Sequence, residues 1–235
     1  MKRLVIITIL AVISTAAMAQ DYLGVQVGYA QPTSRLNSPV NKNTLTPTNY
    51  HGMKLGFVYD GTIFKGFGVS MGLNYTFAGN TTDWVEKAPG YSTVAVRSKD
   101  QLHQLEIVVD WQYKFEIAKN TWVMLYSGPS LQCGLSMSNK WYERYGKDIK
   151  FTTDNNVYSV EDMKDFALKR LNVTWGVGAG FQYDRYFLRG GYDFGIINPY
   201  KAYQFEQTIN DGNPRTRGRF DQWQIKLGVY LWQSR

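Results

Sequence analysis

Charged residues stand inside segments that otherwise alternate apolar with small or polar residues, and they are the first candidates for chemistry in this sequence. Between positions 101 and 117, the four charged candidates Glu106, Asp110, Lys114 and Glu116 all fall on even-numbered positions. Alternate residues of a β-strand point to the same side of a sheet, so these charges share one face. Across the chain, four basic and four acidic residues occupy such positions: Lys54, Glu106, Asp110, Lys114, Glu116, Arg189, Asp193 and Lys226.

Two roles are open to this set of charges. In a narrow, poorly hydrated interior the charges must pair, because an isolated buried charge costs several kcal/mol. A paired network would then fill the interior and stabilise the fold, which is the role we expect. The alternative is a polar-ligand site or a path for protons or ions that uses the same residues.

Histidine supplies the other candidates for catalysis or metal binding. His51 and His103 both lie near strand ends, but neither belongs to a His-x-Ser pattern or has an acidic partner at that end of its strand. No triad or dyad is therefore visible. Two histidines in different strands and the single cysteine, Cys133, offer no ligand spacing for a metal. We predict no catalytic residue, no metal site and no cofactor, with a hydrolase at the rim as the least favoured alternative.

The elements that must position these residues are strands. Apolar residues repeat with a period of two over many segments, and no long helical pattern competes with them. The stretch FGVSMGLNYTFAG, residues 67–79, is an unbroken case with six apolar residues on one side. The predicted strands cover about 21–31, 50–60, 65–78, 101–117, 121–137, 170–183, 186–196 and 219–232.

Short and long connections alternate along the chain. In an up-and-down meander, alternate connections emerge at the same end, so all the long ones lie together. Short periplasmic turns opposite long extracellular loops are typical of bacterial outer-membrane barrels. The tight turns are expected at 60–62, 118–120 and 184–185, and the long loops at 32–49, 79–100, 138–169 and 197–218.

The two faces of the strands indicate which side meets lipid. In the strand predicted at 121–137, one face carries Leu131, Cys133 and Leu135, and the other carries Ser130, Gln132, Gly134 and Ser136. Glycine weakens a solvated sheet but fits the crowded interior of an eight-stranded barrel. The sequence therefore predicts an all-β, eight-stranded antiparallel up-and-down transmembrane β-barrel with short periplasmic turns and four long extracellular loops. The alternative is a secreted soluble barrel of lipocalin type, in which the apolar face would point into the barrel and the polar face would point into water.

The pattern of the first nineteen residues predicts an export signal. Lys2 and Arg3 precede an apolar run from Leu4 to Ile13, and small residues follow up to Ala19. The apolar run is shorter than the ~20 residues that a membrane-spanning helix needs. We predict a signal peptide at 1–19, cleaved after Ala19, and one barrel domain at 20–235. The formal charge of +7 comes without a run of basic residues, so nucleic-acid binding is not expected.

Several segments resemble a known family. They are GVQVGYAQ, GFGVSMGLNYTF, LYSGPSLQCGLS, VTWGVGAGFQYDRYFLRGGYDFG and QIKLGVYLW, and they are similar to the PorT-like outer-membrane β-barrel domain. The resemblance implies a small barrel of the porin family in the outer membrane of a Gram-negative bacterium, with one branch linked to protein secretion across that membrane. It supplies no catalytic or binding motif.

From these observations we expect a non-enzymatic integral outer-membrane protein with a filled polar lumen and long surface loops for ligand or partner contact. The alternatives are a narrow channel, or a transport or secretion accessory. The expected partners are outer-membrane lipid and lipopolysaccharide, with a surface ligand or a secretion-system protein as a further possibility.

Overall fold

The computed structural model describes residues 21–37, 47–86, 95–145, 147–159, 168–199 and 217–234. The predicted signal peptide at 1–19 lies outside these residues and stays a prediction. Among the residues described, none belongs to a helix long and apolar enough to cross a membrane.

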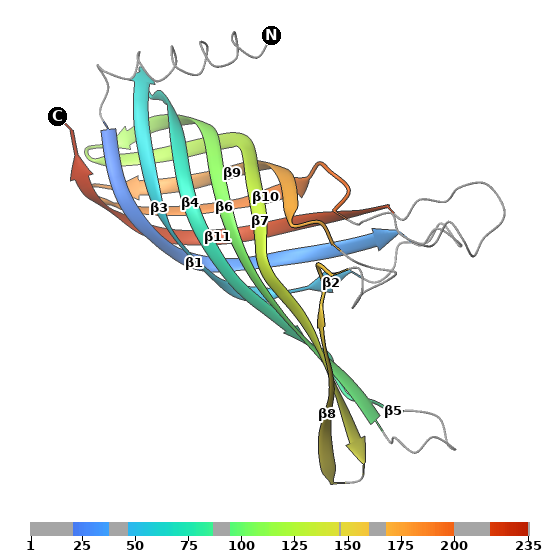
Figure 1. The fold of residues 1–235 in the computed structure, drawn as a ribbon. Coiled ribbons are helices and arrows are strands. Elements are labelled where there is room, and N and C mark those ends of the chain that lie inside the picture. Colours follow the sequence, from blue (N-terminus) through green and yellow to red (C-terminus); the bar gives the residue numbers. More distant parts are fainter. Residues whose placement is uncertain are drawn as a thin grey trace.

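Eight antiparallel strands close a barrel (Figure 1). Each strand pairs with its neighbours in chain order, and β1 pairs with both β3 and β11, which closes the ring. Both ends of the described chain lie together, because Tyr22 pairs with Gln233. The barrel strands are β1 (Asp21–Asn37), β3 (His51–Phe64), β4 (Phe67–Thr81), β6 (Ala95–Ala118), β7 (Thr121–Tyr145), β9 (Leu171–Tyr183), β10 (Tyr186–Gly195) and β11 (Arg217–Gln233).

The three short turns lie at one end of the barrel, but the first is not where the sequence predicted it. β3 runs past 60–62 and ends at Phe64, and the turn consists of Lys65 and Gly66. Both residues have positive φ, 41° and 86°, as a two-residue hairpin of type I′ requires. The other turns use Asn120 (φ 59°) and Asp184 (φ 51°), two residue types that tolerate this left-handed conformation.

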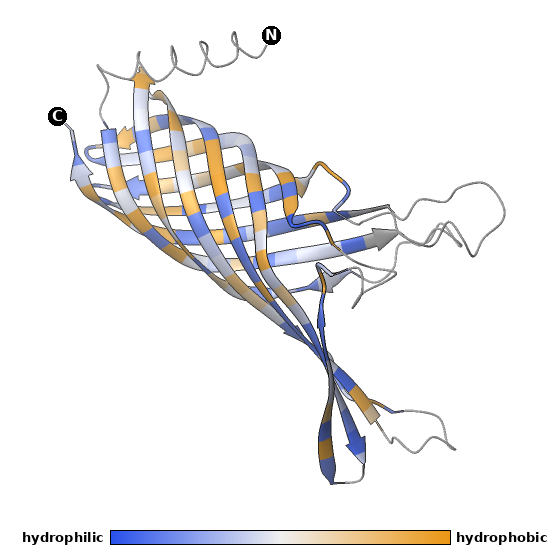
Figure 2. Cartoon of the chain, in the orientation of Figure 1, coloured by the Kyte–Doolittle hydropathy of each residue, from blue (hydrophilic) through white to orange (hydrophobic). Residues whose placement is uncertain are grey.

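Apolar and polar residues alternate along the barrel strands (Figure 2). The outer side of the barrel is apolar and the inner side is polar, as the alternation predicted. Phe57, Leu73, Ile107 and Leu227 are all exposed on the outside. Ser136 is an exception to the predicted facing, since it is exposed and Met137 is buried instead. The reason is a β-bulge, where His103 pairs with Ser136 but Gln104 pairs with Gly134, so β7 carries one extra residue.

Strands β6 and β7 continue beyond the barrel at the end opposite the short turns (Figure 1). There β5 (Val85–Glu86) pairs with β6, and β8 (Asp148–Asn156) pairs with β7. We call β5, residues 95–100, residues 138–145 and β8 the projecting sheet. The sequence predicted loops here, but in β8 Ile149 and Phe151 alternate with Asp148, Lys150 and Thr152, which favours a strand. A last short strand, β2 (Thr48–Asn49), pairs with β1.

Candidate functional site

The barrel interior is the site to which the sequence assigned its charged residues. Seven of the eight are buried there, and Glu116 is not. Glu116 is exposed at the short-turn end, where it lines a hollow of about 480 Å³ with Lys114 and Trp122. The buried ones are Lys54, Glu106, Asp110, Lys114, Arg189, Asp193 and Lys226.

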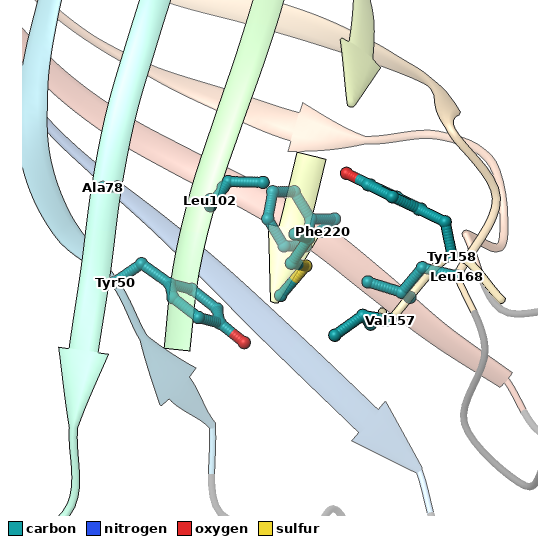
Figure 3. Close-up of a cluster of buried hydrophobic side chains, with 8 residues drawn as sticks. Tyr50, Ala78, Leu102, Val157, Tyr158, Leu168 and Phe220 are labelled. Atoms are coloured by element: carbon teal, nitrogen blue, oxygen red, sulfur yellow. The ribbon is translucent and has the colours of Figure 1, made fainter. Parts of the chain in front are cut away.

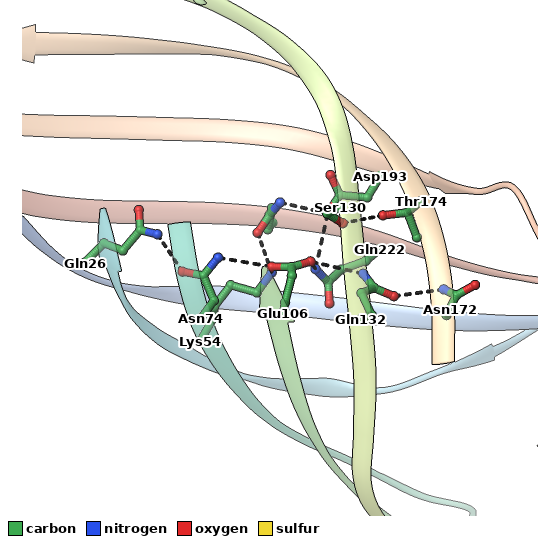
Figure 4. Close-up of polar contacts among 11 residues, drawn as sticks. Gln26, Lys54, Asn74, Glu106, Ser130, Gln132, Asn172, Thr174, Asp193 and Gln222 are labelled. Atoms are coloured by element: carbon green, nitrogen blue, oxygen red, sulfur yellow. Dashed lines mark hydrogen bonds and ion pairs between the residues drawn. The ribbon is translucent and has the colours of Figure 1, made fainter. Parts of the chain in front are cut away.

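The middle of the interior is organised around Glu106 (Figure 4). Its carboxylate accepts hydrogen bonds from Lys54 Nζ at 2.6 Å, Asn74 Nδ2 at 3.1 Å and Gln132 Nε2 at 3.1 Å. Both members of the Lys54–Glu106 ion pair have fully buried side chains. Hydrogen bonds from neutral amides therefore satisfy the carboxylate oxygens that the lysine leaves open, which is the condition under which a buried ion pair is tolerated.

Two glutamines extend this network to Asp193. Lys54 Nζ donates to Gln224 Oε1 at 2.7 Å, and Gln224 Nε2 donates to Asp193 Oδ2 at 2.8 Å. Gln222 Nε2 lies 3.3 Å from the same Asp193 oxygen. The residues come from β3, β10 and β11, and β1 lies between β3 and β11 in the ring, so the network joins strands that are not all neighbours.

A second cluster, nearer the short turns, is built on Asp60. Its Oδ2 accepts from Arg189 Nη2 at 2.5 Å, from Lys114 Nζ at 3.2 Å and from the hydroxyl of Tyr230. Arg189 Nη1 also donates to Ser70 Oγ at 2.7 Å. The Asp60 side chain is fully buried, so one carboxylate holds two buried cations.

Asp60 is the functional candidate that the sequence analysis missed. It was assigned to a turn because Asp60 and Gly61 are common turn residues. The alternation of the strand could have identified it, because Lys54 and Val58 point inward at even-numbered positions and Asp60 is the next such position. With Asp60 added and Glu116 removed, the interior set still holds four basic and four acidic residues, and its formal charge is balanced.

Aromatic side chains fill the interior at the short-turn end. The cluster consists of Tyr22, Val58, Met124, Phe187 and Tyr230, and the Phe187 and Tyr230 ring centroids are 4.7 Å apart. Glycines make room for these rings, since a Cβ on Gly228 would collide with the Phe187 ring. The glycines of the polar face therefore serve packing in the lumen, as the sequence predicted.

A separate apolar cluster closes the opposite end, and we call it the cap (Figure 3). Part of it comes from Val157, Tyr158 and Leu168, which lie between β8 and β9 in the sequence. Burial raises the pKa of the Tyr158 hydroxyl to about 12, so this side chain stays neutral at physiological pH. The cap consists of Tyr50, Ala78, Leu102, Met137, Val157, Tyr158, Leu168 and Phe220.

The outer wall carries a hollow of about 670 Å³, lined by residues that include Val25, Leu55, Phe57 and Leu227. All four point away from the lumen, and no charged side chain lines the hollow. In a membrane, acyl chains would fill such a surface depression.

The two histidines lie apart from the interior network. The Nδ1 atom of His103 is 2.6 Å from the Tyr75 hydroxyl, and that of His51 contacts the Tyr29 hydroxyl. Both histidines stand on the outward face, and Ser136 lies opposite His103 in the register of β6 and β7. Within the described part of the chain, neither imidazole is hydrogen-bonded to a serine or a carboxylate. Among the described residues, no group of three or more His, Cys, Asp or Glu side chains is placed to hold a metal ion.

A closed antiparallel barrel with an apolar outer wall and a polar, ion-paired interior defines an outer-membrane β-barrel protein. Residues 18–200 match the family described as outer membrane protein beta-barrel domain, and the chain belongs to this family. The predicted fold class and the outer-membrane location in a Gram-negative bacterium are thereby confirmed.

Solved structures similar to this chain are outer-membrane barrels of low sequence identity. Ail of Yersinia pestis is 10% identical, with 90% of this chain and 97% of Ail covered at a TM-score of 0.40. Neisserial surface protein A is 13% identical, with 89% and 97% covered at a TM-score of 0.40. The outer membrane protease OmpT of Escherichia coli is 8% identical, with 92% and 97% covered at a TM-score of 0.43. No curated protein matches the sequence.

Proposed function

We propose that this protein is a non-enzymatic outer-membrane barrel with a closed, structural interior, and that its projecting sheet and long loops contact a ligand or partner at the cell surface. The observation that carries this proposal is the filled lumen. The aromatic cluster, the two ion-paired clusters and the cap succeed one another from the short turns to the barrel mouth. Such an interior leaves the surface as the place for function.

A closed lumen makes a direct prediction about conductance. Purified protein inserted into a planar bilayer should show no discrete current steps, because the aromatic cluster, the ion-paired clusters and the cap fill the lumen. Replacing the cap residues Leu102 and Phe220 together with glycine should still give no steps, since the ion-paired clusters and the aromatic cluster remain in place. Reproducible steps from the unaltered protein would contradict the proposal and favour the alternative of a narrow channel.

The absence of enzymatic activity is supported by the histidine contacts. A rim hydrolase would need an imidazole paired with a nucleophile or a carboxylate, whereas His51 and His103 each meet a tyrosine hydroxyl. We expect ester and peptide hydrolysis by the purified barrel at background level, and the same level for His51→Ala and His103→Ala. Hydrolysis by the unaltered protein that falls a hundredfold or more in either variant would establish an enzyme instead.

The finer assignment as a PorT-like barrel, with an accessory role in secretion, is part of the same proposal. It is supported by the resemblance of the five segments quoted above. Outer-membrane lipid and lipopolysaccharide would surround the barrel, and a surface ligand or a secretion-system protein would contact the projecting sheet.

Surface contact is tested by shortening the projecting sheet. Thr82 is hydrogen-bonded to Ser98, and Lys140 pairs with Asp154, so Asn-Gly turns can replace residues 83–97 and 141–153 without disturbing the barrel. Chemical cross-linking on intact cells should then lose the products that the full-length protein gives. Heat-modifiable migration on gels would show that the barrel still folds. Unchanged cross-linking would contradict surface contact through this sheet.

A further inference from the structure

One face of the projecting sheet carries a row of arginine and aromatic side chains. In the register of the strands, Arg97 on β6 stands opposite Tyr142 on β7, and Tyr142 stands opposite Phe151 on β8. Residues directly opposite in an antiparallel pair point to the same face. The Tyr142 and Phe151 ring centroids are 5.7 Å apart, so this part of the row is packed.

Two guanidinium groups stack on the Trp84 ring at this face. The Arg97 guanidinium carbon lies 4.6 Å from the centre of the Trp84 ring and 5.6 Å from that of Tyr142. The Arg144 guanidinium carbon lies 5.1 Å from the centre of the same Trp84 ring. Arg144 stands opposite Ala95, which is completely buried. The small alanine side chain leaves room for the arginine side chain to reach the Trp84 ring. The two cations are therefore oriented before any ligand arrives.

Neither guanidinium has an acidic partner within the described part of the chain. By contrast, Arg35, Arg189 and Arg219 each contact an aspartate within 3.1 Å. Guanidinium groups that are oriented by stacking and not neutralised keep their N–H donors available for an anion.

The neighbouring lysines add positive charge on the same face. Lys99 stands directly opposite Lys140, an arrangement of like charges that is destabilising by itself. Lys140 contacts Asp154 at 3.5 Å, in a pair that is partly exposed. Among the described residues that the strand register places on this face, Arg97, Lys99, Lys140 and Arg144 stand with Glu86 and Asp154, which is four positive charges against two negative ones.

We propose that this face binds a soluble polyanion through phosphate or sulfate groups, with Arg97 and Arg144 as the central donors. The inference rests on the proposed function, because it assigns a ligand class to the surface said to make contact. Arg97 lies five residues along β6 beyond Leu102 of the cap, which is about 17 Å at the usual rise of a strand. The face therefore lies beyond the cap, on the part of β6 that projects from the barrel (Figure 1), where a soluble ligand can reach it.

The test uses a double variant and a control with the same loss of charge. Arg97→Gln with Arg144→Gln removes both guanidinium groups, while Lys147→Gln with Lys150→Gln removes two positive charges, one from the turn before β8 and one from β8. Lys150 suits the control because it stands opposite Glu143, on the other face. All proteins are placed in phosphatidylcholine nanodiscs and titrated with fluorescent dextran sulfate, with uncharged dextran as the probe control.

We expect the unaltered protein to bind dextran sulfate and not dextran. The arginine variant should bind at least about tenfold more weakly, since it loses the charge-assisted hydrogen bonds of both guanidinium groups. The lysine control should stay within about threefold of the unaltered protein. Heat-modifiable migration of each variant would establish that the barrel is intact.

Three outcomes would overturn the inference. The first is equal binding by the unaltered protein and the arginine variant, and the second is an equal loss in the lysine control. The third is a protein that does not bind dextran sulfate but gains thermal stability when lipid A is present in the nanodisc, with the gain lost in the arginine variant. The phosphate groups would then come from the membrane and not from a soluble ligand. None of these outcomes bears on the conductance and cross-linking tests, so the proposed function can fail or stand separately.

Discussion

Asp60→Asn is expected to lower the free energy of unfolding of the barrel by about 3–5 kcal/mol, which is the usual cost of removing one partner from a buried charge pair. The side chain is fully buried and meets both Arg189 and Lys114. Asparagine keeps the shape and one acceptor oxygen but removes the charge. Two cations would then remain inside the barrel with no carboxylate between them, and the folded state would bear that cost.

The measurement is urea unfolding of the refolded barrel in lipid, followed by tryptophan fluorescence and by gel mobility with and without heating. Asp184→Asn is the matched control, because Asp184 is an exposed turn residue with φ of 51° that asparagine also adopts readily. That control should change stability by no more than about 0.5 kcal/mol. A loss below about 1 kcal/mol for Asp60→Asn would show that water reaches the cluster and screens it.

A double-mutant cycle would locate the cause of the loss. Arg189→Gln removes the cation closest to Asp60, at 2.5 Å. If the cost of Asp60→Asn comes mainly from an unpaired Arg189, the double variant should lose less stability than the sum of the two single variants. Additive losses would indicate that Lys114 or the Tyr230 hydroxyl carries the effect instead.

The sequence predicted the faces of the barrel well because facing depends on local alternation alone. Every second residue from Phe67 to Phe77 points outward, and the intervening small and polar residues point inward. Strand ends were less predictable. The sequence shortened β3 by several residues and so missed Asp60, and it assigned most of the projecting sheet to loops. Turn residues occur inside strands as well as between them, and alternation does not mark where a strand leaves the membrane.

The ionic contacts of the interior depend on a different kind of information. The sequence correctly placed Lys54, Glu106 and Arg189 on the polar face, but it could not say that Lys54 meets Glu106 or that Arg189 meets Asp60. Those pairs join strands that are not neighbours, so they depend on the closure and stagger of the barrel. The bulge in β7 is similar, because one inserted residue reverses the facing of all later residues without changing their types.

Arginine at Met71 tests the orientation of the wall directly. Met71 and Leu73 are exposed near the middle of β4, between Phe67 at the short-turn end and Phe77 at the other end. If this wall meets lipid, Met71→Arg should lower the free energy of unfolding by about 2–4 kcal/mol, because a charge at the middle of the bilayer must be desolvated. Urea unfolding in lipid, as for Asp60, would measure the loss.

A substitution to arginine near the rim provides the internal control, because the free-energy cost of the charge depends on its depth in the bilayer. Phe67 lies beside Tyr113 at the short-turn end, where the strand leaves the hydrocarbon. Phe67→Arg should cost about 0–1 kcal/mol in charge transfer, since the guanidinium group can reach the headgroups. An outer wall in water would give the opposite result, with little loss at Met71 or Phe67. Equal losses at the two positions would mean that packing of the replaced side chains dominates over their depth in the membrane.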